Sequence, residues 1–205
     1  MAKYDDKSVF IPGKGAVLIG AVGAEMPALE EVERWVKAGA TGNLGTMEPL
    51  GYTSVEDLPS FDVDTDGGEK KGAWENDSLR TTQVKTTETI TVTPIQWSGV
   101  ALEHRFGKGK VDPKTGKFSV PAAYTSSEVA LTVVVLDGQT PLVWHFYKVA
   151  SAPDGGIEPK EDDFLGFGIK YTILQQPGKP GRWEIAHAGL KGESSSSSGD
   201  GRSMV

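Results

Sequence analysis

Side chains alternate in character along the stretch Thr81–Gln96, which reads TTQVKTTETITVTPIQ. This alternation predicts a β-strand, because successive side chains of a strand point to opposite faces of a sheet. One face is then largely apolar and the other carries almost only hydroxyl groups. The first set is Val84, Thr86, Glu88, Ile90 and Val92, and the second is Lys85, Thr87, Thr89, Thr91 and Thr93. We therefore expect a sheet with one packed face and one polar face.

Strand signals recur along the rest of the chain. Glu128–Leu136 and Leu142–Val149 are apolar segments joined by DGQTP, in which Asp137 and Gly138 tolerate the positive φ of a hairpin turn. Other predicted strands are Gly15–Val22, the FSVP segment at 118–121, Phe164–Leu174 and Arg182–Ala186. The predicted fold class is mainly β: an antiparallel β-sandwich or half-barrel with one or two short α-helices and a long inter-strand loop.

Two segments have the spacing of short helices. In the first, after Pro27, apolar residues recur at helical intervals and a glycine follows as a stop; these are Leu29, Val32, Trp35, Val36 and Gly39. In the second, Ser98 is placed as an N-cap and Gly107 as the end. The first pattern is compatible with an amphipathic helix or with a loop.

The segment Ala40–Leu79 has no regular pattern and is rich in Gly, Pro, Asp and Thr. Loops of this length usually carry function or lie against a partner. Its centre, DVDTDGGEKKG, begins like a calcium-binding loop with Asp62, Asp64 and Asp66, but the glutamate required at the twelfth position is Ala73. A solvated acidic loop is the favoured interpretation, and a weak cation site over Asp62–Asp66 stays open as the alternative.

Composition limits the classes of function. The 205 residues carry a net charge of −7, which disfavours tight binding to nucleic-acid phosphates, and the absence of cysteine excludes disulfides and cysteine-based zinc sites. The N-terminal MAKYDDKSVF has no apolar stretch like that of a signal peptide, and no apolar run is long enough to cross a bilayer, so membrane insertion is not expected. We predict one β domain over residues 1–190 and a disordered Ser/Gly-rich tail over residues 191–205.

No constellation of residues predicts an enzyme. The histidines, His104, His145 and His187, lie far apart and outside any metal-binding spacing. The chain has no phosphate-binding glycine loop and no GxSxG nucleophile motif. We expect structural histidines, no catalytic residue, no metal and no cofactor. A binding or assembly module fits these observations best.

One ordered series of motifs is more specific. LGYTSVEDLPSF (Leu50–Phe61) is followed by GAWENDSLRTT (Gly72–Thr82), the threonine-rich strand, the helix ending in HRFGKG, and FSVP. The series continues with EVALTVVVLDG, HFYKVA and FLGFGIKYTIL. This order resembles the major tail proteins, or tail tube proteins, of long-tailed bacteriophages, particularly those that infect actinobacteria. The resemblance covers roughly Gly15 to Ala186; Pro27–Gly45 and the Ser-rich tail depart from it.

The resemblance implies a function and a set of partners. In that family six subunits form a ring, the rings stack into a tube, and the lumen conducts DNA and holds the tape-measure protein. The implied partners are further copies of the chain, the tape-measure protein, and the tail terminator and baseplate proteins. The implied location is the virion tail, assembled in the cytoplasm of the host bacterium. The alternative is a virion-borne or secreted β-sandwich recognition module that binds carbohydrate or acts as an adhesin.

Two sets of residues are candidate sites on this interpretation. Four apolar residues scattered along the long loop are predicted to contact neighbouring subunits or rings: Tyr52, Leu58, Phe61 and Trp74. The candidate lumen or barrel strand carries Lys85, Thr87, Glu88, Thr89, Thr91 and Thr93. A hydroxyl face in an acidic protein suits a channel wall, because it repels phosphate and lets DNA slide without specific binding. The same face also fits an ordinary half-exposed strand, where threonine is common.

Overall fold

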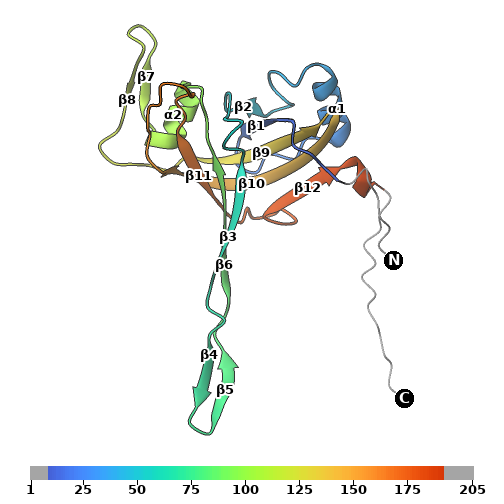
Figure 1. Ribbon diagram of the computed structural model, residues 1–205, viewed down its shortest axis with the longest axis vertical. Coiled ribbons are helices and arrows are strands. Elements are labelled where there is room, and N and C mark those ends of the chain that lie inside the picture. The colour runs from blue at the N-terminus through green and yellow to red at the C-terminus, as the bar shows by residue number, and fades with distance from the viewer. Residues whose placement is uncertain (1–8, 192–205) are drawn as a thin grey trace.

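The computed structural model describes residues 9–191 and is mainly antiparallel β-sheet, as predicted (Figure 1). The main sheet has the strand order β2-β1-β9-β10-β11-β6-β3, and β12 pairs with the first half of β10. Its strands are β1 (Lys14–Gly20), β2 (Glu48–Pro49), β3 (Ser60–Asp66), β6 (Lys85–Val92), β9 (Glu128–Asp137), β10 (Thr140–Asp154), β11 (Gly168–Ile173) and β12 (Trp183–His187). The order ends at β2 and β3, so the sheet is open rather than a closed barrel.

Two small hairpins and two α-helices complete the fold. The hairpins are β4 (Lys70–Ala73) with β5 (Asn76–Thr81), and β7 (Lys110–Asp112) with β8 (Lys117–Ser119). The helices are α1 (Leu29–Lys37) and α2 (Gly99–Phe106), and a 3-10 turn spans Ala188–Leu190. The Ser98 side chain accepts a hydrogen bond from the Ala101 N–H at 3.2 Å, which is the predicted N-cap of α2. Both predicted helices are therefore confirmed.

The apolar core lies on both faces of the sheet. The side chains of β9 point alternately to the two faces and so contribute to two clusters. Leu131 and Val133 belong to the first cluster, and Ala130 and Val134 belong to the second. Helix α2 covers the first cluster, in which Ala101 packs among residues of β6, β10 and β11. Helix α1 covers the second through Val32, Trp35 and Val36. The amphipathic pattern of α1 thus faces the sheet, as its sequence spacing indicated.

The sheet curves until strands that are not hydrogen-bonded neighbours touch. The Phe61 ring on β3 lies 5.4 Å from the rings of both Trp144 and Phe146 on β10. From β6, the Glu88 carboxylate accepts hydrogen bonds from Arg182 Nη2 at 2.9 Å and from the Trp183 indole at 3.1 Å. These contacts close the concave side around the first core cluster. The architecture is a half-barrel, one of the two forms predicted.

Arg105 of α2 ties the ends of two strands together. Its Nη1 donates to the carbonyl oxygens of Asp154 at 2.6 Å and Gly168 at 2.7 Å, and its Nη2 donates to that of Gly155 at 2.7 Å. The residue is only 7% exposed. Buried carbonyls need hydrogen-bond partners, and this guanidinium supplies one to each of three. It therefore holds the end of β10 against the start of β11.

The prediction of an irregular loop over residues 40–79 is wrong for the second half of this segment, which forms strands. β3 pairs with β6 along its whole length, and β4 and β5 form a hairpin beyond it. Every side chain of β3 is exposed, so burial leaves no periodic signal in the sequence, and pairing with β6 supplies the order instead. The single strand expected over 81–96 is likewise divided, because β5 ends at Thr81 and β6 begins at Lys85.

The aspartates of the expected acidic loop lie on a strand. Asp62, Asp64 and Asp66 occupy every second position of β3 and therefore lie in a row on one face of an extended strand. They cannot wrap around an ion as the residues of a calcium loop do. Among the side chains that the structure describes, no three His, Asp or Glu residues gather closely enough to hold a metal ion. Neither helix of the same range is long and apolar enough to cross a membrane. The predicted disordered tail falls, except for Lys191, outside the described residues.

Two buried histidines should make the fold sensitive to acid. His104 Nδ1 lies 2.8 Å from the Tyr171 hydroxyl, and His145 lies between the Thr132 hydroxyl at 2.8 Å and the Ala24 carbonyl at 2.9 Å. Burial lowers the pKa of His104 to about 4 and also lowers the pKa of His145. Both rings are thus neutral in the folded protein at neutral pH, as the prediction of structural histidines requires.

As the pH falls below about 6.5, the unfolded chain binds protons at these histidines while the folded chain does not. The free energy of unfolding should therefore decrease with acidification, by about 2 kcal/mol between pH 7 and pH 5 from His104 alone. Urea titrations at several pH values measure this slope. His104→Gln should flatten the slope, and parallel pH profiles for the two proteins would contradict the assignment.

Candidate assembly surfaces

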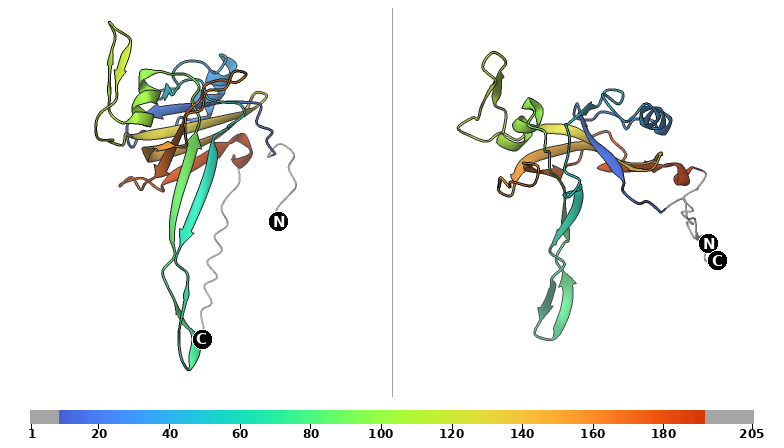
Figure 2. Two further views of the ribbon diagram at one scale, coloured as in Figure 1. Left: turned by 60° about the vertical axis from the view of Figure 1, so that its left-hand side comes forward. Right: turned by 45° about the horizontal axis from the view of Figure 1, so that its top comes forward.

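A long β-arm projects from the body of the subunit (Figures 1 and 2). Strands β3 and β6 form its base, and the β4–β5 hairpin forms its end. At the junction Gly67 has φ +93°, and a Cβ on it would lie 2.3 Å from the Gln83 carbonyl oxygen. Only glycine fits there, because the outgoing and returning segments of the arm pass too close to each other for a side chain. The arm is thus one continuous hairpin with a single tight crossing of its two segments.

The outer part of the arm exposes apolar side chains that nothing in the described chain covers. Trp74, in the turn between β4 and β5, is 98% exposed, and Leu79 and Val84 are also exposed. A tryptophan buries about 150–250 Å² when it packs against a partner. Its placement at the end of an arm makes this tip a candidate contact surface.

The hydroxyl face of β6 continues across neighbouring strands. On β3, Ser60, Asp62 and Asp64 lie directly opposite Thr91, Thr89 and Thr87. On β11, Lys170 and Thr172 lie opposite Thr91 and Thr89. Since directly paired residues share a face, these side chains form one polar surface, which we call the threonine face. All of its described side chains are exposed or half-buried.

The candidate lumen residues do not all belong to this surface. Lys85, Thr87, Thr89 and Thr91 lie on the threonine face, and Thr93 follows in the same alternation. Glu88 points to the opposite face, where its side chain is 16% exposed and binds Arg182 and Trp183. Glu88 therefore joins β6 to β12.

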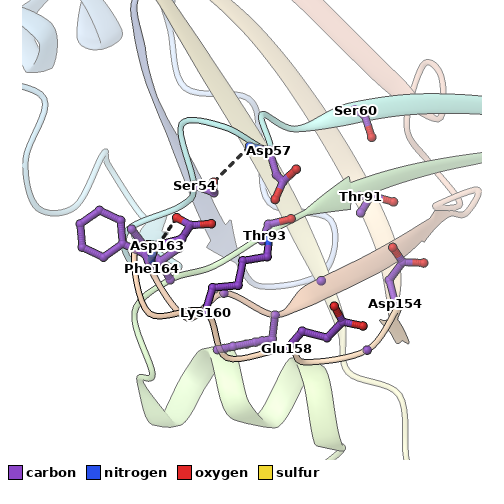
Figure 3. Close-up of a pocket in the computed structure, with 15 residues that line it drawn as sticks. Ser54, Asp57, Ser60, Thr91, Thr93, Asp154, Glu158, Lys160, Asp163 and Phe164 are labelled. Atoms are coloured by element: carbon purple, nitrogen blue, oxygen red, sulfur yellow. Dashed lines mark hydrogen bonds between the residues drawn. The ribbon is translucent and has the colours of Figure 1, made fainter.

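An acidic cleft of about 440 Å³ extends the threonine face (Figure 3). Thr91 and Thr93 form part of its wall, and the loop after β10 forms another part. Its charged residues are Asp57, Asp154, Glu158, Lys160 and Asp163. Asp154 pairs with Lys170 at 3.2 Å, and Asp163 accepts a hydrogen bond from the Phe164 N–H at 2.7 Å. Carboxylates outnumber lysines here, so the cleft repels phosphate groups.

A second hollow, the apolar groove, lies between the start of β1 and the segment that leads into β3. Its volume is about 470 Å³. Its apolar walls include Val55, Leu58, Phe61, Val135 and Trp144. Strand β2 pairs only with Leu18 and Ile19, so within the described chain the first residues of β1 have no strand on their outer side. The groove thus opens beside a free sheet edge.

Residues 1–187 match the family of phage tail tube proteins. The chain belongs to this family. The chain is similar to the major tail proteins Gp23 of Mycobacterium phages L5 and D29, with 30% and 29% identity over 190 residues. Each alignment covers 85% of this chain and 88% of the relative. The resemblance inferred from the ordered motifs is confirmed, and this tail tube protein is a structural component of a phage tail.

The predicted contact residues of this tail tube protein fall at three places. Leu58 and Phe61 line the apolar groove together. Trp74 lies at the arm tip, and Tyr52 is 77% exposed on the body, where its N–H donates to Gln96 Oε1 at 3.1 Å. The groove residues on β1, β9 and β10 were not found from the sequence, because they look like ordinary strand residues. Their grouping depends on pairing between distant segments.

Proposed function

We propose that this tail tube protein forms rings of six subunits that stack into a tube, with the threonine face lining the lumen. The observation that carries the proposal is the uncovered polar face across β3, β6 and β11, which continues into the acidic cleft. The hydroxyl groups bind water and keep the lumen wall hydrated, and the carboxylates repel DNA phosphates. The lumen then conducts DNA without specific binding and holds the tape-measure protein.

Ring closure uses the two free edges of the open sheet. β3 ends the sheet on one side, and the start of β1 ends it on the other. Pairing of one subunit's edge with the opposite edge of its neighbour makes a continuous barrel and covers strands that would otherwise favour aggregation. The number six comes from the family resemblance. Further partners are the tail terminator and baseplate proteins, and assembly takes place in the host cytoplasm.

Electron microscopy of the purified protein over a range of protein and salt concentrations tests the proposal. We expect hollow tubes of uniform diameter, and a reconstruction with sixfold symmetry and the threonine face inside. A reconstruction with that face on the outer wall would contradict the lumen assignment. A protein that stays monomeric and binds glycans would favour the recognition-module alternative.

A further inference from the structure

We propose that the arm tip of one subunit inserts Trp74 into the apolar groove of a second copy in the next ring. The inference rests on the proposed tube function and names the partner surface of the arm. Trp74 is 98% exposed and has neighbours on the arm that are also exposed and apolar, Leu79 among them. The groove offers about 470 Å³ beside Leu58, Phe61 and Trp144. An apolar projection and an apolar hollow are thus present on the same chain.

A subunit cannot fill its own groove. Phe61 lines the groove at the base of the arm, and Trp74 lies beyond the end of β4. At about 3.3 Å per residue, the chain from one to the other spans up to about 45 Å. The β4–β5 hairpin lies at the far end of the arm, away from the body of the subunit (Figures 1 and 2). The groove is lined from the base of β3 and from the body strands, so the tip lies far from it. The occupant has to be another copy.

The position of these two surfaces is compatible with an open stack. A patch that fits a hollow elsewhere on the same molecule makes a head-to-tail contact, which repeats without end when the rotation between copies does not close a ring. Stacked rings need this property along the tube axis. The arm length then sets an upper limit of about 45 Å on the distance between successive grooves.

Charged residues of both signs lie beside each of the two surfaces. Lys71 and Arg80 are directly opposite each other across the β4–β5 hairpin, a pairing of like charges that is unfavourable in an isolated subunit. Lys71 binds Glu69 at 3.0 Å, which offsets part of the repulsion. Glu56 and Asp57 are exposed between the groove residues Val55 and Leu58. Glu75 is exposed beside Trp74, and Lys14 lines the groove. Opposite charges can therefore pair in both directions when the tip is seated, the groove carboxylates with the hairpin cations and Glu75 with Lys14.

Disulfide trapping tests the contact directly, because the natural chain has no cysteine. Glu75→Cys beside Trp74, combined with Val55→Cys beside Leu58, keeps the proposed anchor and its pocket. This pair should give, in oxidised tubes, a ladder of covalent multimers that reductant removes. The matched control combines Glu75→Cys with Val120→Cys, since Val120 is also exposed but lies outside the groove. We expect no ladder from the control. Tubes without a ladder from the first pair, or dimers from Glu75→Cys alone, would overturn the inference.

A second measurement does not depend on cysteine chemistry. Trp74→Ala and Leu58→Glu should each raise the protein concentration at which tubes appear by at least tenfold, as for a buried interface tryptophan and its pocket. Trp74→Phe should have a smaller effect. Wild-type tubes together with unchanged assembly of Trp74→Ala would overturn this inference alone. Failure of the wild-type protein to form tubes would overturn the proposed function as well.

Discussion

A protein in which residues 67–84 are replaced by Asn-Gly should fold normally and form no tubes. Asp66 and Lys85 are directly paired, so a two-residue turn of this type connects them without changing the register of β3 and β6. The removed part carries the exposed Trp74, Leu79 and Val84 and contributes to neither core cluster. We expect the free energy of unfolding to change by less than about 1 kcal/mol. Urea unfolding and electron microscopy measure the two effects.

A matched control shortens the other hairpin. Asp112 and Lys117 are directly paired in β7–β8, so replacing residues 113–116 by Asn-Gly makes an equivalent change away from the arm. This variant should assemble like the wild type. Normal tubes from the arm deletion would mean that the arm is not an assembly element. Loss of tubes in both variants would mean that any hairpin change blocks assembly.

Arg105→Met should cause the largest loss of stability among single substitutions at this end of the sheet. The guanidinium donates to three carbonyl oxygens at 2.6–2.7 Å, and methionine leaves them without that donor while filling a similar volume. Arg105 Nε has no hydrogen-bond partner within the described chain, so these three bonds are the hydrogen bonds of the guanidinium group there. We expect a decrease of about 3–5 kcal/mol in the free energy of unfolding, because unsatisfied buried acceptors each cost about 1–3 kcal/mol.

The measurement is the urea midpoint at constant m value. Arg105→Lys should recover part of the loss, since an ammonium group can reach some of the carbonyls but lacks the planar fork. Arg34→Met on the exposed side of α1 is the control, and it should change stability by less than about 0.5 kcal/mol. A small effect at Arg105 would mean that the ends of β10 and β11 are held by the strand pairing alone.

Local features were predictable where one segment contains its own physical reason. The N-cap of α2 needs only Ser98 and the backbone three residues later. The β9–β10 turn needs only Gly138, whose φ is +58°. The alternation of β6 gave the correct division into a packed and a polar face. The ordered motifs identified the family, because the order in which they follow one another is specific even where each motif alone is weak.

Other features required contacts between distant segments. β3 has no buried side chain, so only its pairing with β6 shows that an apparently irregular stretch is a strand. Phe61 shared a predicted role with Trp74, yet its ring packs on Trp144 beside the groove while Trp74 extends at the far end of the arm. The sequence by itself determined the strand periodicity, the two helices and the family. Only the tertiary structure decided the arm, the groove and the extent of the threonine face, because strand pairing and sheet curvature join residues that local preferences cannot relate.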